Sequence, residues 1–546
     1  METELEALPD DALAHVLRGL PARSLATARC VCKAWRAIVD ARALLLPHFL
    51  PHSVHGIFVN YIDHGRPHFF ARPSSASSMS RGIDGMLGFM HNDHVRDWWS
   101  VMDHCNGLLV CDMELESELC VCNPATRRWT GLPRHAGRSR DYAGAYLVFD
   151  PAESPHYEVF LIPVVPEEPS PSDRRKVDEE RRARLRQQEI DAPFFLDWFF
   201  SLPRGAIIAD GTGEEVQQAV ESSPSVNKDH EPDHDPFRLM EWPPSPWRLS
   251  VFSSRSGRWE DRAFVREGEP AGTVKDMRLD PLEPTWRGPR RRYAVYQRGV
   301  LYVHCRGSFI TRFSLSNDKY VVIKIPADIK DAKPYLGGSQ NQVYFGIFDG
   351  HQLRVWILNE SCGHIEWLLK YEADLGLYAH YVASLPYNNG RQLDGSWMVE
   401  GNTDVSDIDD DVEAQSNGSI ERDSDKDKIY VSGIGDNVET QSDESIEWDS
   451  DNDDFFAVEA GSEQYCRGQF HILGFHPYKE VVFLVEWFGV AAYHLNTSKI
   501  QYLGNSRPKC YYRNHTNGIS ESFLYTPCMI GDLLRGDNTG QSLYED

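Results

Sequence analysis

The sequence predicts an α+β multidomain chain: a small α-helical module over residues 1–46, an all-β domain over residues 47–526 and a C-terminal tail over residues 527–546. Three observations support this division. Apolar residues near the N-terminus recur at helical spacing. After about Pro51, short β-rich runs alternate with turn residues. Two stretches, about 165–246 and 394–463, differ from those runs in composition and are expected to be long disordered insertions.

The N-terminal module is predicted to be a hairpin of two short helices. The first carries apolar residues at i, i+3, i+4, i+7 spacing from Leu13 to Leu20, and the second continues the same spacing from Ala28 to Val39. Two helices this short cannot bury both apolar stripes by themselves. We therefore expect another surface to cover them, which makes the segment a docking module.

Two Leu-Pro steps and one longer string lie within this module. The steps are Leu8-Pro9 and Leu20-Pro21, and the string is Val-Cys-Lys-x-Trp-Arg, beginning at Val31. On these residues the segment resembles the F-box. The resemblance implies binding to a Skp-type adaptor and, through it, to a cullin-based ubiquitin ligase. The residues expected to divide between the helical core and the adaptor-facing surface are Leu8, Pro9, Leu13, Val16, Leu17, Leu20, Pro21, Leu25, Val31, Cys32, Trp35 and Ile38. An ordinary hairpin packed on its own domain is the alternative.

Five β-rich units share one plan: an apolar strand, a polar turn, and a strand that opens with an aromatic or β-branched residue. The residues after the last turn are Trp129, Trp259, Tyr320, Trp367 and Ile500. With the insertions removed, the units recur every roughly 45–60 residues, close to the ~40–50 residues of a four-stranded propeller blade. A blade hides its sheet faces only against its neighbours, so the ring must close. We predict six to eight propeller-like blades, with these five residues packed between blades.

Two further stretches, His55 to Phe70 and Tyr142 to Pro163, are candidates to supply or complete other blades. Strings such as HCNGLLVCD, from His104, resemble the F-box-associated domains of a large plant family. That resemblance covers about residues 104–503 and implies a propeller-like receptor for a protein substrate whose identity is unknown. A Gly-Gly doublet of the kelch type occurs only at Gly337-Gly338, so motifs do not determine the blade count.

The net charge of −26 is concentrated in one segment. Residues 401–463 hold 21 Asp and Glu against 3 Lys and Arg, a net charge of −18. Direct nucleic-acid binding is not expected, because a phosphate backbone needs clustered basic residues. The dense basic patch over residues 287–292 is interpreted as a solvated loop. The alternative function is an acidic propeller scaffold that binds basic proteins without a role in ubiquitination.

The sequence predicts no catalytic residues, no cofactor and no metal site, and therefore no enzyme. Phosphate-binding loops, nucleophile elbows and His-Glu-x-x-His helices do not occur. The 11 cysteines form no Cys-x-x-Cys pair. His230 and His234 lie in a loop-like segment that is not expected to present ligands on one helical face.

The expected location is cytoplasmic and/or nuclear, without membrane association. The N-terminus is acidic and lacks the regions of a signal peptide. The longest apolar run, Val481 to Tyr493, contains Glu486 and is too short to span a bilayer. Residues 174–189 are expected to form a solvated helix, with a nuclear import signal as the alternative interpretation.

Overall fold

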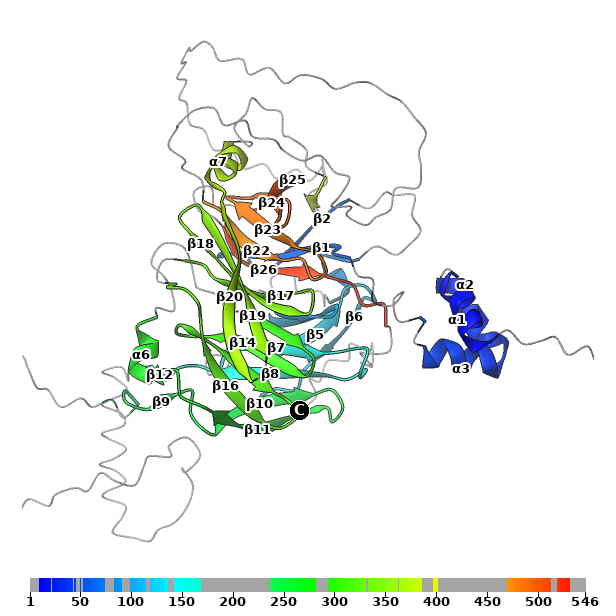
Figure 1. Cartoon of the computed structure of the whole chain (residues 1–546), viewed down its shortest axis with the longest axis horizontal. Coiled ribbons are helices and arrows are strands. Elements are labelled where there is room, and N and C mark those ends of the chain that lie inside the picture. Colours follow the sequence, from blue (N-terminus) through cyan, green and yellow to red (C-terminus); the bar gives the residue numbers. More distant parts are fainter. Residues whose placement is uncertain are drawn as a thin grey trace, which may run out of the picture.

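The computed structural model describes residues 9–20, 22–42, 44–45, 50, 53–73, 83–90, 99–113, 118–135, 142–167, 235, 237–280, 293–329, 332–361, 363–384, 396–400, 469–511 and 518–530. The prediction of a helical N-terminal module followed by a largely β domain is confirmed (Figure 1). The predictions for residues 168–234, which include the segment 174–189 and His230 and His234, and those for residues 287–292, 401–463 and 531–546 lie outside the described residues, as do Leu8 and Pro21. None of the described helices is both long and apolar enough to cross a membrane.

The described part of the N-terminal module contains three helices, α1 (Asp10–Arg18), α2 (Ala22–Val31) and α3 (Lys33–Ala41). The prediction of a two-helix hairpin is therefore wrong. The second apolar pattern is divided at Cys32, whose backbone is extended (φ −154°, ψ 168°). Its Sγ accepts a hydrogen bond from the Trp35 backbone N–H at 3.5 Å, so the residue caps α3. Apolar spacing alone does not detect such a break, because the stripe continues across it.

Among the described residues, the β domain contains six runs of four antiparallel strands, numbered here as sheets 1 to 6. Sheet 1 contains β1 (Gly56–Tyr61), β2 (His68–Ala71), β21 (Met398–Val399) and β26 (Ile519–Tyr525). Sheet 2 contains β3 (Trp99–Cys105), β4 (Leu108–Met113), β5 (Glu118–Asn123) and β6 (Arg128–Gly131). Sheet 3 contains β7 (Tyr142–Phe149), β8 (Tyr157–Pro163), β10 (Trp247–Ser253) and β11 (Arg258–Glu267).

Sheet 4 contains β13 (Ala294–Gln297), β14 (Val300–Cys305), β15 (Phe309–Ser314) and β16 (Lys319–Lys324). Sheet 5 contains β17 (Tyr335–Ser339), β18 (Gln342–Asp349), β19 (Gln352–Ser361) and β20 (His364–Asp374), and sheet 6 contains β22 (His471–Phe475), β23 (Val481–Glu486), β24 (Gly489–His494) and β25 (Lys499–Asn505). Sheets 3 and 4 are joined by parallel pairing of β11 with β16. The smaller elements are η1 (Gly88–Met90), β9 (Glu241–Trp242), β12 (Gly272–Thr273), α6 (Val274–Arg278) and α7 (Gly376–Ser384).

The sheets follow one another around a closed ring. One strand of each sheet contacts the corresponding strand of the next, in the cycle β26, β3, β7, β13, β17, β22 and back to β26. A separate cluster of buried apolar side chains fills each of the six interfaces between neighbouring sheets. Each sheet therefore buries both faces, and no sheet could do so outside the ring.

Strand β23 contributes apolar side chains to two interfaces at once. Phe483 and Val485 belong to the cluster shared with sheet 1, whereas Val482 and Leu484 belong to the cluster shared with sheet 5. Successive side chains of a strand point to opposite faces, so a strand buried on both faces is apolar at every position. This explains the long apolar run that begins at Val481.

Sheet 1 closes the ring from both ends of the β domain. Strand β1 pairs with β26, with Gly56 opposite Tyr525 and Phe58 opposite Phe523. The stretch from His55 to Phe70 therefore supplies two strands of an additional sheet. The stretch from Tyr142 to Pro163 completes sheet 3 by pairing with β10.

Both predicted insertions are too long at one end. Residues 237–246 include β9, and Trp242 is buried in the cluster between sheets 3 and 4. Residues 396–400 include β21, where Trp397 and Val399 are buried between sheets 1 and 6. Large apolar side chains in these two segments offset the entropy lost on ordering.

The five residues predicted to follow the last turn of each unit do pack between neighbouring sheets. The Trp259 Nε1–H in sheet 3 donates to the Pro133 carbonyl beside sheet 2 at 2.7 Å. The Trp367 Nε1–H in sheet 5 donates to the Lys324 carbonyl in sheet 4 at 2.9 Å. The Tyr320 hydroxyl in sheet 4 donates to the Pro244 carbonyl, which precedes β10 of sheet 3, at 2.8 Å. Trp129 and Ile500 pack in the clusters at the interfaces of sheets 1 and 2 and of sheets 5 and 6, respectively.

Polar side chains also link neighbouring sheets near the centre of the ring. The Asn60 amide in sheet 1 donates to the Val101 carbonyl in sheet 2 at 2.7 Å, and its oxygen accepts from the Val101 N–H at 3.1 Å. The carboxyl of Asp103 in sheet 2 accepts from the Leu147 N–H in sheet 3 at 2.8 Å. Burial raises the pKa of Asp103 to about 8. This carboxyl is therefore mostly neutral at pH 7.

We predict that Gly107→Ala destabilises the β domain more than Gly299→Ala. Both glycines occupy two-residue hairpin turns and have positive φ angles of 87° and 74°, so each substitution strains the backbone by about 1 kcal/mol. A Cβ at Gly107 would also lie 2.4 Å from the Cys528 backbone nitrogen, whereas nothing lies within 4 Å at Gly299. We expect a further 1–3 kcal/mol, roughly, from this overpacking. Equal losses in chemical denaturation would contradict the prediction.

Asp103→Asn should alter how stability depends on pH. Between about pH 4 and pH 8 the folded chain holds a proton on Asp103 that the unfolded chain has lost. The free energy of unfolding of the wild type should therefore fall relative to the variant by about 1.4 kcal/mol for each pH unit in that window. Asparagine retains an acceptor for the Leu147 N–H. The measurement is denaturant unfolding of both proteins at several pH values, and parallel pH profiles would refute the assignment.

Candidate functional site

The three N-terminal helices form a core of their own. Leu17, Leu25 and Ile38, one from each helix, are almost fully buried in one cluster. Every member of that cluster lies between residues 13 and 45. Among the described residues, the module thus has an apolar core of its own.

Ion pairs hold the three helices in register. The Arg29 guanidinium in α2 donates two hydrogen bonds to the Asp40 carboxylate in α3, at 2.6 and 3.0 Å. These bonds hold the pKa of Asp40 below its usual range. A second pair joins Arg42, which follows α3, to Asp11 in α1 at 2.5 Å. Both pairs lie at the surface, so they orient the helices relative to one another but add little to the free energy of unfolding.

The structure divides the predicted adaptor-contacting residues into two sets. Leu17, Leu25 and Ile38 are core residues. Val16 and Val31 are exposed by 57% and 63%, respectively, although both are large and apolar. The residues that fall between these sets, half-buried at the edge of the core, are Leu13, Leu20 and Trp35.

Pro9 and Cys32 have local roles at helix starts. Pro9 occupies the position before α1, and Cys32 caps α3 through its sulfur. Both side chains are exposed as well. Among the described residues of the module, Val16 and Val31 are the large apolar side chains that remain exposed to solvent.

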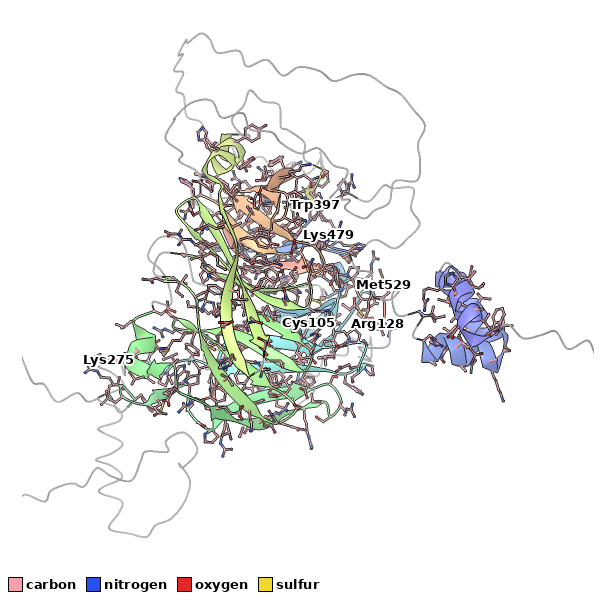
Figure 2. All side chains as sticks on the ribbon, viewed as in Figure 1. Cys105, Arg128, Lys275, Trp397, Lys479 and Met529 are labelled. Atoms are coloured by element: carbon pink, nitrogen blue, oxygen red, sulfur yellow. The ribbon has the colours of Figure 1, made fainter. Side chains whose placement is uncertain are left out.

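A cavity of about 200 Å³ opens at the centre of the ring. Its lining comes from sheets 2, 4, 5, 6 and 1, close to the turns that follow the innermost strands. Cys105, on the sheet 2 side, lies in the interior of the β domain (Figure 2). Four tyrosines and several amide side chains contribute to the lining, and they include Tyr293, Tyr296, Tyr335, Tyr478, Gln297 and Asn341.

The described lining of this cavity is aromatic and close to neutral. It contains no lysine or arginine among the described residues. Burial raises the pKa of Asp103 to about 8 and lowers the pKa of His104 to about 4, so both groups are mostly uncharged at pH 7. Tyrosine rings and amides of this kind suit contact with a polypeptide, since they offer apolar area and hydrogen bonds together.

Sequence reasoning did not find this cavity. It left the substrate-binding residues unknown, and the lining residues come from sheets distant in sequence. One local signal was present in the HCNGLL string, because Asn106 and Gly107 form the two-residue turn beside the cavity. A turn motif by itself does not reveal which other turns stand around it.

One group of potential metal ligands occurs among the described residues. His64, His68 and Cys510 place one ligand atom each within 4.8 Å of one another. They come from opposite ends of the β domain sequence, so no local spacing motif connects Cys510 with the two histidines. Asp235, from the segment around His230 and His234, is ion-paired with Arg278 instead.

Comparison with known proteins identifies the helical module. The family model for the F-box domain matches residues 5–46. The chain is 30% identical over 164 residues to F-box protein At5g07610 of Arabidopsis thaliana, a segment that covers 28% of this chain and 37% of that protein. It is 32% identical over 154 residues to F-box protein ETP2 of the same plant, covering 27% of this chain and 40% of that protein.

A third relative is an F-box/kelch-repeat protein, At3g61590 of Arabidopsis thaliana, 29% identical over 148 residues. That match covers 25% of this chain and 32% of the relative. The chain thus spans less than half the length of each of these relatives. The self-contained helices, the family match and these relatives together identify an N-terminal F-box domain, and the chain is a distant homologue of Arabidopsis F-box proteins with a β-rich C-terminal domain.

Proposed function

We propose that this chain is the substrate-recognition subunit of a Skp–cullin–F-box ubiquitin ligase. The observation that carries the proposal is the exposure of Val16 and Val31 on an F-box whose core is already complete. Leaving two large apolar side chains in water is unfavourable by about 1.5–3 kcal/mol each relative to burial. An external adaptor that covers them would gain that free energy toward the cost of association.

We further propose that the β domain is a six-bladed propeller that binds the target protein over its central cavity. The closed cycle of strand contacts and the six interface clusters support the propeller. The tyrosine-rich lining supports a polypeptide as the ligand. In this function the chain supplies no catalytic group. It holds a target lysine near a ubiquitin-charged enzyme and so raises the effective concentration of the reactants.

Replacing Val16 and Val31 together by aspartate should strongly weaken adaptor binding without unfolding the module. A buried, unpaired carboxylate costs several kcal/mol at an interface, so we expect the affinity to fall by at least ~10-fold. The measurement is the dissociation constant of the full-length chain for a Skp-type adaptor, with circular dichroism to verify helix content. Val265→Asp is the matched control, because Val265 in β11 is also exposed by 53%. Unchanged adaptor affinity in the double variant would rule out this docking surface.

The target-binding role of the cavity is tested in the background of that double variant, which should hold targets without presenting them to the ligase. Adding Tyr296→Ala and Tyr478→Ala should release captured proteins, since a tyrosine at the centre of an interface contributes about 2 kcal/mol or more, roughly 30-fold in affinity. Proteins that copurify from plant cells would be compared by quantitative mass spectrometry. Leu377→Ala on α7, exposed by 48%, is the control. Capture of the same proteins at the same yield by all variants would contradict the role of the cavity.

A further inference from the structure

Three metal-binding side chains meet where the ring closes. The turn between β1 and β2 carries His64, and His68 is the first residue of β2. Their Nε2 atoms lie 2.9 Å apart. The Cys510 Sγ, from the segment after β25, lies 3.9 Å from His64 Nε2. The hairpin belongs to sheet 1, whereas the cysteine follows the last strand of sheet 6.

Both segments that carry the cluster are anchored independently of it. The Tyr511 hydroxyl donates to the Ile62 carbonyl at 3.0 Å, and the Tyr61 hydroxyl donates to the Ser506 carbonyl. Tyr511 is buried, and its ring lies edge-on to His64 with centroids 5.6 Å apart. The two segments are therefore held face to face before any ligand arrives, which lowers the entropic cost of binding.

The two imidazoles present their Nε2 atoms to the cluster. His68 Nδ1 is buried and has no hydrogen-bond partner among the described residues. Nε2 is then the atom through which His68 engages its surroundings, and it faces the other two ligand atoms.

We propose that His64 Nε2, His68 Nε2 and Cys510 Sγ form a zinc site. Imidazole and thiolate are the ligands that Zn²⁺ prefers, and neither suits Mg²⁺ or Ca²⁺. With Zn–N and Zn–S bonds of about 2.0–2.1 and 2.3 Å, ligand atoms in a tetrahedral site lie roughly 3.3–3.6 Å apart. The distances of 2.9 and 3.9 Å lie on either side of that range, and all three ligand atoms lie within 4.8 Å of one another.

The proposed ion would join sheet 1 to the segment that follows sheet 6. Cys510 is exposed, so the fourth position faces solvent and would hold a water molecule. Because more than 400 residues of the unfolded chain separate Cys510 from the two histidines, three-ligand binding requires the closed ring and would stabilise it. This role is independent of adaptor and target binding.

The test uses the purified full-length chain. Elemental analysis after zinc loading and desalting should find one equivalent of zinc, and Co²⁺ loading should produce a thiolate-to-cobalt charge-transfer absorption. Cys510→Ser should abolish that absorption. Cys510→Ser and His64→Gln should each weaken zinc affinity by more than the ~10-fold that loss of an outer-shell partner costs, as measured by competition with a chromophoric chelator.

Two matched controls separate this site from incidental binding to other cysteines and histidines. Cys30→Ser replaces another exposed cysteine, and His364→Gln replaces an exposed histidine at the start of β20. Neither should change the affinity or the cobalt spectrum. Zinc should raise the unfolding temperature of the wild type and of both controls, but not that of Cys510→Ser. Equal zinc affinity in wild type and Cys510→Ser, or a cobalt spectrum without thiolate character, would overturn the proposal. Neither result would bear on the separate proposal that the F-box domain binds an adaptor.

Discussion

The β domain depends on one constraint: every sheet covers its apolar faces only with its neighbours, so the ring must be closed. Closure occurs in sheet 1, where β1 from the start of the domain pairs with β26 from its end, and β2 pairs with the other edge of β1. Without that pairing, sheets 2 and 6 would each expose one face of apolar side chains. The clusters at these two interfaces contain large residues such as Phe58, Tyr525 and Phe483. Closure therefore stabilises all six interfaces together, which makes the domain a cooperative unit.

Hydrogen bonds from polar groups fix the position of each of these sheets relative to its neighbour. Trp259 and Trp367 combine a large apolar ring with one N–H donor. Each N–H donates a hydrogen bond to a backbone carbonyl in or directly after the preceding sheet. At the centre, Asn60 and Asp103 satisfy backbone groups of the adjacent strand. Apolar contacts alone would tolerate small slips between sheets, whereas these hydrogen bonds are lost on any slip. The same arrangement explains why a carboxyl can lie near the centre, since it remains mostly protonated at pH 7.

The two parts of the chain differ in where they leave surface for binding. The F-box domain completes its core with three short helices and leaves Val16 and Val31 outside it. The β domain buries its apolar side chains at closed interfaces and offers a neutral cavity lined by tyrosine at its centre. An exposed apolar surface favours a constant partner of complementary shape. A cavity surrounded by turns suits a partner that differs between relatives, because turns vary with little effect on the sheets.

The sequence by itself determined the helical module, the β character of the remainder and the positions of the residues that pack between sheets. These features depend on local periodicity, which reports the apolar face of each element. Only the tertiary structure decided the break at Cys32, the pairing of β8 with β10 across a long insertion, and the closure of sheet 1. It alone also brought together the lining of the cavity and the cluster of His64, His68 and Cys510. The physical reason is that side-chain period specifies which face is buried but not which distant strand covers it, and partner choice follows from closing the whole ring.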